Sequence, residues 1–161
     1  LESTSIHLIH MAIARIVDFF PRAGFDAEDI AEYNALTHLE YERIRDFLIL
    51  HYKLTERDDS PFWNYCRTMD IPATLQRKLD LFASNGRIYR YQDELFAETS
   101  WLQVMIGQRV MPRGNHPFAD LLPEAELQAH VSHVAQVVAK CAQAMPSQAE
   151  FIAQHCAADL G

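Results

Sequence analysis

Long apolar runs, paired cysteines and basic clusters are all scarce in this sequence of 161 residues. The most apolar segment, residues 6–20, carries His7, His10, Arg15 and Asp18, and no stretch approaches the roughly 18 unbroken apolar residues of a membrane span. The three cysteines lie far apart without a C-x-x-C pair, which argues against a disulfide framework or a zinc knuckle. We therefore expect a reduced, cytoplasmic protein that neither spans nor binds a membrane.

The charge balance excludes another class of partner. Fourteen Lys and Arg against 22 Asp and Glu give a formal net charge of −8, and the few basic residues are interrupted by acids. A phosphate backbone requires a clustered cationic face, so we expect no nucleic-acid partner. With 49% apolar and 22% charged residues, the composition is typical of one folded domain rather than of a disordered chain.

The opening segment has the spacing of an amphipathic helix. Residues 3–5 are Ser-Thr-Ser and can cap it, and Pro21 and Gly24 end it. One stripe of apolar residues is predicted to face the core: Ile6, Ile9, Ile13, Ile16, Val17 and Phe20.

The remaining sequence also predicts helices, each with a start or stop signal. The expected ranges are 27–53 after the N-cap Asp26, 61–69, 73–84 before Asn85-Gly86, 96–110, and two helices after Pro123 and Pro146. Residues 87–92 are expected to be extended or irregular, and no segment shows a convincing strand alternation. The fold class predicted is all-α, an irregular helical arrangement.

Three patterns of polar residues give weak chemical signals. No histidine has a glutamate three residues before it, and the pairs His7/His10 and His130/His133 have no obvious third ligand, so we expect no metal site. A cysteine–histidine nucleophile has no local support. Charges that alternate at helical spacing predict a solvated or interdomain face: Glu40, Glu42, Arg43, Arg45 and Asp46.

The first seven residues give a more specific chemical signal. Glu2 stands beside small hydroxyl residues at the start of a helix, whose free N–H groups can receive an anion near Thr4 and Ser5. Glu2 would be a general base for a substrate in the same place. Ordinary helix capping explains the same residues, and both interpretations stay open.

Several ordered segments resemble one enzyme family. The string Leu-Glu-Ser-Thr-Ser-Ile-His over residues 1–7, together with residues 40–47, 51–54, 57–63 and 101–112, resembles the flavin-dependent tryptophan halogenases. The resemblance covers the chain to about Pro123 and is to the C-terminal part of such an enzyme. It implies that residues 1–161 are the helical portion of a larger protein, a fragment that is inactive alone.

The resemblance also implies a chemistry. Such enzymes use reduced FAD, supplied by a flavin reductase, with oxygen and a halide ion to chlorinate or brominate an electron-rich aromatic ring, tryptophan or another indole. It assigns acid–base catalysis to Glu2, halide binding to Thr4 and Ser5, and cofactor binding to Ser3 and Ile6. Ser5 stands where the best-known members carry glycine, and serine tolerates fewer backbone conformations.

The substrate side is implied by aromatic residues further along the chain. Phe96 and Trp101 are the expected pocket aromatics, with Glu94 and Tyr89, and also Tyr91, as candidates for its polar end. Helix-core packing is the alternative for Phe96 and Trp101. The family's Phe-Trp pair is not complete here, and this departure suggests free indole, another indole or a phenolic ring as the substrate rather than tryptophan itself.

Parts of the enzyme are missing from these residues. The chain has no G-x-G-x-x-G for the FAD pyrophosphate and no W-x-W-x-I-P segment, and the family's lysine lies upstream. The N-terminal FAD-binding part of the same protein is therefore an expected partner. Two other functions stay open: a helical interaction module without catalysis, and a flavin monooxygenase relative that hydroxylates.

Overall fold

The computed structural model describes residues 2–91 and 94–156, with Glu2 and Ser3 described by their backbone only. All regular elements of these residues are helical, which confirms the predicted all-α class. The chain forms two compact units, Leu1–Asn115 and His116–Gly161, and each is described by itself.

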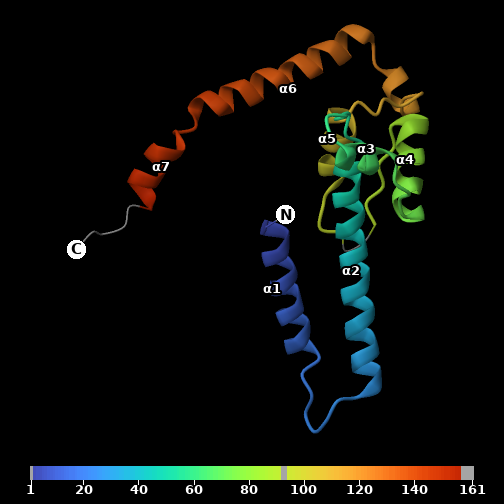
Figure 1. The fold of residues 1–161 in the computed structure, drawn as a ribbon. Coiled ribbons are helices and arrows are strands. Elements are labelled where there is room, and N and C mark those ends of the chain that lie inside the picture. The colour runs from blue at the N-terminus through green and yellow to red at the C-terminus, as the bar shows by residue number, and fades with distance from the viewer. Residues whose placement is uncertain (1, 92–93, 157–161) are drawn as a thin grey trace. The chain divides into compact units, whose positions relative to one another are not determined.

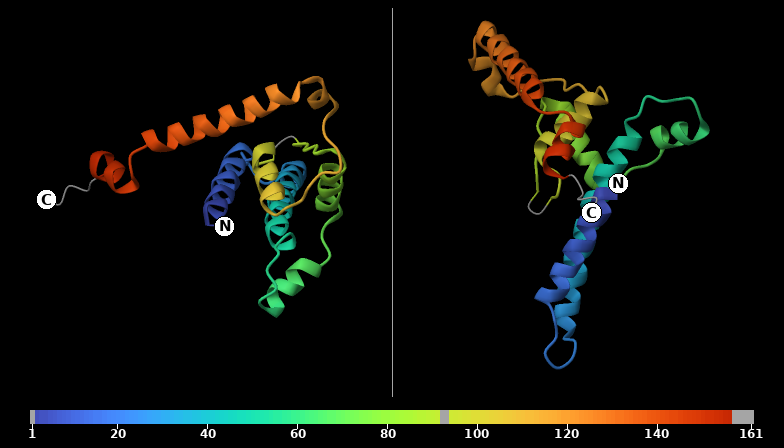
Figure 2. Two further views of the ribbon diagram at one scale, coloured as in Figure 1. Left: turned by 90° about the horizontal axis from the view of Figure 1, so that it is seen from above. Right: turned by 90° about the vertical axis from the view of Figure 1, so that its left-hand side faces the viewer.

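One long helix organises the first unit. This helix, α2, contacts each of the other four helices of the unit (Figure 1). Both further views show α1 running beside α2 (Figure 2). The helices of this unit are α1 (Glu2–Asp18), α2 (Ala27–Lys53), α3 (Pro61–Thr68), α4 (Ala73–Asn85) and α5 (Glu98–Gly107).

Local signals fix the ends of these helices much as the sequence predicts. The Asp26 carboxylate accepts a hydrogen bond from the Glu28 backbone N–H at 2.9 Å and caps α2. Ser60 caps α3, where Pro61 occupies the first turn without losing a needed N–H. Gly86 ends α4 at φ 67°, a left-handed conformation that glycine adopts without a side-chain clash.

The core of this unit lies where α4 and α5 cover the second half of α2. Its fully buried side chains come from three helices, so removing their apolar surface from water holds the helices together. They are Leu50, Leu75, Phe82, Trp101 and Met105, with Phe47 beside them.

Helix α1 differs from the prediction at its start. The helix already begins at Glu2, so the predicted capping residues 3–5 lie within its first turns instead of before it. The half-buried positions on α1 include Thr4, His7, Met11 and Arg15, which recur at helical spacing. This mixed polar and apolar face is therefore the one turned toward α2, since α2 is the helix that contacts α1.

The apolar stripe of α1 is exposed, which corrects the prediction that it faces the core. Ile6 and Ile9 are each 58% exposed, and the stripe continues in the same way to Phe20. Apolar residues that recur about every 3.6 positions show that a helix has an apolar side, but they do not show which neighbouring element covers it. Among the helices that the structure describes in the first unit, none covers that side.

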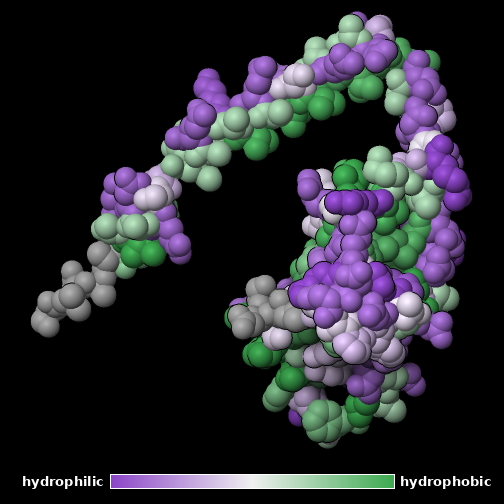
Figure 3. Space-filling model, turned by 45° about the horizontal axis from the view of Figure 1, so that its top comes forward, coloured by the Kyte–Doolittle hydropathy of each residue, from purple (hydrophilic) through white to green (hydrophobic). Residues whose placement is uncertain are grey.

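The second unit consists of η1 (Pro117–Leu121), α6 (Glu124–Ala144) and α7 (Gln148–His155). The predicted helices after Pro123 and Pro146 are confirmed, whereas the short 3₁₀ turn of η1 was not predicted. A reciprocal capping box joins Ser147 and Glu150, and the Ser147 donors hold the pKa of the Glu150 carboxyl below its ordinary value. Figure 3 shows hydrophobic side chains along one side of α6. The exposed apolar residues of this helix include Leu127, Val131, Val134 and Val138.

Among the described helices, none combines the length and the apolar character needed to cross a membrane.

The core makes a quantitative prediction. Phe82 is 1% exposed, so Phe82→Ala should lower the free energy of unfolding by about 3–5 kcal/mol through lost burial and a residual cavity. Phe62→Ala, at a 56% exposed ring, should cost below about 1 kcal/mol. Urea unfolding followed by circular dichroism measures both. Equal losses in the two variants would place the core elsewhere.

The exposed apolar stripe of α1 leads to a prediction about association. The chain expressed by itself should bind a hydrophobic dye and associate, because exposed contiguous apolar surface promotes both. Replacing Ile9 and Ile13 together with Asp should reduce dye fluorescence and shift light scattering toward the monomer. A dye-negative, monodisperse wild-type chain would contradict this expectation.

Candidate functional site

A buried ion pair joins Glu94, one of the predicted substrate-side residues, to Lys78. Glu94 is only 4% exposed. The Lys78 ammonium of α4 lies 2.9 Å from one oxygen of its carboxylate and 3.1 Å from the other. A carboxylate removed from water is stable only when it is paired in this way. Lys78 also donates to the Tyr89 carbonyl at 2.8 Å, which fixes the segment leading to Glu94.

Aromatic rings surround the same ammonium group. The Lys78 nitrogen lies 4.6 Å from the ring centroid of Trp101 and 4.7 Å from that of Tyr91, within cation–π range. The rings of Tyr89 and Tyr91 meet edge to face at 5.2 Å. Lys78, which the sequence analysis missed, thus gathers Tyr89, Tyr91, Glu94 and Trp101 around one charge.

Arg90 holds the backbone of this segment. Its guanidinium donates two hydrogen bonds to the carbonyl of Glu94, at 2.6 and 3.2 Å. Residues 87–91 have no regular secondary structure, as predicted. Side chains rather than a backbone ladder therefore give this irregular segment its shape.

Two cavities share Glu94 as a lining residue, and we call them together the Glu94 cleft. Their volumes are about 370 and 270 Å³, near the lower end of the range of small-molecule sites. Both are lined by Leu39, Arg43 and Glu94. The first is completed by His7, Met11, Arg15, Leu36, Glu40 and Leu95, and the second by Glu42, Asp46, Thr74, Arg77, Lys78, Tyr91 and Trp101.

The two predicted pocket aromatics lie differently. Trp101 lines the second cavity of the Glu94 cleft and is also a core residue, 2% exposed, whose indole N–H finds no acceptor among the described residues. Phe96 stacks on Phe47 with ring centroids 3.9 Å apart and does not line the Glu94 cleft. It precedes α5, which begins at Glu98 and not at residue 96 as predicted.

The start of α1 holds the other predicted residues. Thr4 is half-buried, whereas Ser5 and Ile6 are exposed, and none of the three lines the Glu94 cleft. The side chains of Glu2 and Ser3 lie outside the described part of the chain. His7, one turn beyond Thr4, is the residue of this helix end that does reach the cleft.

The predicted charged face on α2 is partly wrong. Glu40 and Asp46 are buried, at 9% and 5% exposure. Glu40 pairs with His7 and Arg15, and Asp46 accepts from the Thr74 hydroxyl. Alternating charges on a helix indicate a solvent-exposed face only when no neighbouring element supplies partners for them. Here α1 and α4 supply such partners.

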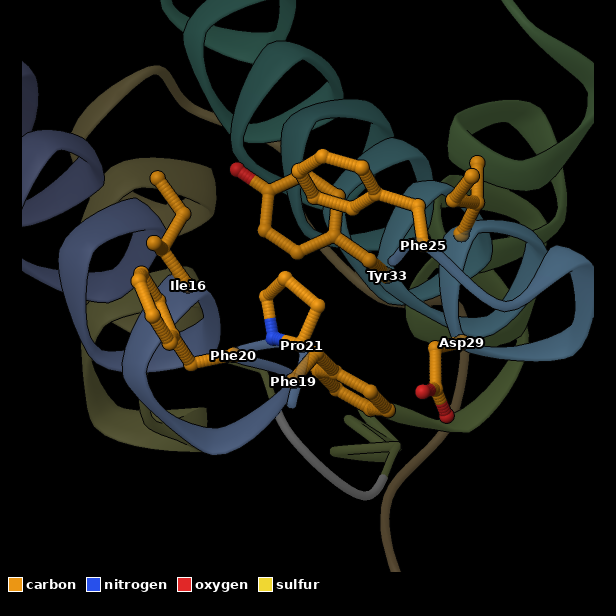
Figure 4. A pocket seen from close by; sticks show the side chains of 8 residues that line it. Ile16, Phe19, Phe20, Pro21, Phe25, Asp29 and Tyr33 are labelled. Atoms are coloured by element: carbon orange, nitrogen blue, oxygen red, sulfur yellow. The ribbon is translucent and has the colours of Figure 1, made fainter. Parts of the chain in front are cut away.

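A separate apolar cavity of about 320 Å³ lies where α1 turns into α2 (Figure 4). Asp29 is the one charged residue in its lining. The other lining residues are aromatic, aliphatic or proline: Ile16, Phe19, Phe20, Pro21, Phe25, Ile30 and Tyr33. A catalytic site needs several convergent polar groups to orient a substrate. The Glu94 cleft meets that requirement better than this cavity.

No group of three or more His, Cys, Asp or Glu side chains with metal-binding geometry occurs within residues 4–91 and 94–156.

Comparisons with known proteins define the class first. The fold is similar to part of a flavin-dependent halogenase from Xanthomonas campestris, Xcc4156, with 45% identity over 98% of this chain and 32% of that one, and a TM-score of 0.89. The flavin-dependent halogenase BrvH from Brevundimonas sp. BAL3 is similar at 39% identity and a TM-score of 0.88, over 96% of this chain and 31% of that one.

The family follows from the sequence model for tryptophan halogenases, which matches residues 1–124. The chain belongs to the tryptophan halogenase family and corresponds to its C-terminal portion. The 7-chloro-L-tryptophan 6-halogenase KtzR from Kutzneria sp. (strain 744) is 26% identical over 96% of this chain. The chain spans about 30% of the length of such curated relatives.

The buried ion pair yields a stability prediction. Lys78→Met should destabilise the first unit by about 3–5 kcal/mol, because it leaves the buried Glu94 charge without its partner. The double variant Lys78→Met/Glu94→Gln should regain most of the loss, since no lone charge remains. Lys140→Met, at an exposed lysine of α6, is the matched control and should change little. Denaturant midpoints measure all three. A double variant no more stable than Lys78→Met would contradict the pairing argument.

Proposed function

We propose that this chain is part of a flavin-dependent halogenase that chlorinates or brominates an electron-rich aromatic ring, tryptophan or another indole, using reduced FAD, oxygen and a halide ion. Membership of the tryptophan halogenase family is the observation that carries the proposal. Similarity to two flavin-dependent halogenases over nearly the whole chain supports it. The FAD-binding part, an upstream segment of the same protein, and a flavin reductase are the proposed partners.

The proposed reaction needs a base and an anion site close together. Electrophilic substitution ends when the ring loses a proton, and we propose that Glu2 assists this step as a general base. Helix α1 begins at Glu2, and the partial positive charge of a helix N-terminus favours an anion, so we propose that the halide ion binds near Thr4 and Ser5.

Reduced FAD, when bound, would supply the oxidising chemistry together with oxygen. The residues present fit only one edge of such a cofactor. Ile6 is 58% exposed at the first turns of α1, which leaves its side chain available for an apolar ring system. Ser3 and Ile6 are the proposed contacts, and the phosphate-binding elements belong to the upstream part.

The substrate is proposed to meet the aromatic and charged residues around the Glu94 cleft, namely Tyr89, Glu94, Phe96 and Trp101. Both carboxylate oxygens of Glu94 are already engaged by Lys78. A substrate ammonium would have to compete with that lysine, so this arrangement favours an indole without a charged amino acid end. Phe96 stacks on Phe47 and does not line the Glu94 cleft, and it stays a proposed substrate residue on the family resemblance alone.

One alternative has an observation in its favour. The exposed apolar stripe of α1 suits a helical module that binds a protein partner without catalysis. A relative that hydroxylates instead of halogenating would use the same cofactor, so product analysis must separate the two.

The test uses the complete enzyme with reduced flavin, oxygen and bromide against a panel of indoles, including tryptophan. We expect brominated product, recognised by its isotope doublet, and a preference for indoles that lack the ammonium group. Oxygenated product without bromide dependence would indicate a hydroxylase, and no product would favour the interaction module.

Glu2→Gln tests the base. We expect a loss of about 10²–10⁴-fold in kcat, the usual contribution of a positioned acid–base group. Glu28→Gln, which changes an acidic residue in the first turn of α2, is the matched control and should keep wild-type turnover. Undiminished halogenation by Glu2→Gln would remove Glu2 from the mechanism.

A further inference from the structure

Helix α1 is tied to α2 by one buried carboxylate. Glu40, 9% exposed near the middle of α2, reaches two residues of α1 at once. The His7 Nε2 lies 2.9 Å from one of its oxygens, and the Arg15 guanidinium lies 2.6 Å from the other. The Nε2–H of the imidazole donates to the carboxylate, which can only accept.

These two contacts define the register of α1. His7 and Arg15 are eight residues apart, about 12 Å along a helix, so a single partner holding both restricts sliding as well as rotation. On the side of α1 away from α2, the stripe from Ile6 to Phe20 is exposed, so the described residues supply no apolar packing there. Among the described helices of the first unit, only α2 contacts α1.

The first contact lies next to the proposed halide residues. Thr4 and His7 are three residues apart, which makes them neighbours on a helix surface, and both are half-buried on the side facing α2. We propose that Glu40, by holding His7 and Arg15, is a positioning residue that sets the orientation of Thr4 and Ser5 for the halide ion. This inference rests on the proposed function.

The surroundings make the Glu40 contacts strong. Leu36 and Leu39 of α2 and Met11 of α1 line the cavity beside Glu40, and such apolar neighbours lower the local dielectric constant. Loss of the carboxylate would leave the Arg15 charge without this partner and the His7 ring without its acceptor. The first turn of α1 would then lose its fixed orientation.

The first experiment measures bromination by the complete enzyme at increasing bromide concentration. Glu40→Ala should raise the KM for bromide by about tenfold or more, because small misplacements of a binding group are costly, and by a larger factor than the KM for the indole, whose proposed cleft Glu40 also lines. Glu32→Ala, which removes an exposed carboxylate from the same helix, is the matched control and should leave both constants unchanged. An unchanged bromide KM in Glu40→Ala would overturn the proposal.

Two further variants separate positioning from general loss of stability. Glu40→Gln keeps an oxygen for the His7 N–H and should fall between wild type and Glu40→Ala. His7→Ala should raise the bromide KM as well, and His7→Ala/Glu40→Ala should be no worse than the more impaired single variant. Multiplying effects in the double variant would show that Glu40 does not act through His7.

Hydrogen exchange gives a readout that needs no turnover. The amides of residues 5–8 should exchange faster in Glu40→Gln than in wild type, and those of Glu32→Ala should not. If the wild-type enzyme forms no brominated product, the proposed function fails, while faster exchange still supports the positioning of α1 by Glu40. Unchanged exchange in Glu40→Gln would overturn that positioning.

Discussion

The pairing of Lys78 with Glu94 is the interaction on which the candidate site depends. An unpaired carboxylate in that position would have to take up a proton or become exposed to solvent. In the second case the irregular segment that carries Glu94 would have to move with it. The pair instead holds that segment against α4, next to the rings of Tyr91 and Trp101. Lys78 therefore fixes the position of Glu94, the residue through which it affects both cavities of the Glu94 cleft.

Much of the fold could be predicted because its signals are local. Asp26, Ser60 and Gly86 act through hydrogen bonds or backbone angles within a few residues, and each ends or begins a helix where the sequence indicates. The start of α1 was misplaced because three consecutive hydroxyl residues can each cap a helix, and nothing local decides among them.

The parts that could not be predicted are pairings across long sequence separations. Glu40 meets residues 25 and 33 positions away in the sequence, and Lys78 meets Glu94 across a segment without periodicity. A charge pattern on one helix carries no information about such partners. Glu40 is therefore buried although charged residues are usually exposed, and the Ile6–Phe20 stripe is exposed although apolar residues are usually buried.

Burial also separates the two tryptophans of the chain. Trp63 is half-buried beneath the Arg57 guanidinium, whereas Trp101 is enclosed in the core with Lys78 over its ring. An indole shielded from water emits at shorter wavelength than one in contact with it. Fluorescence from Trp101 thus provides an intrinsic optical probe beside the cleft, able to register an arriving ligand without any label.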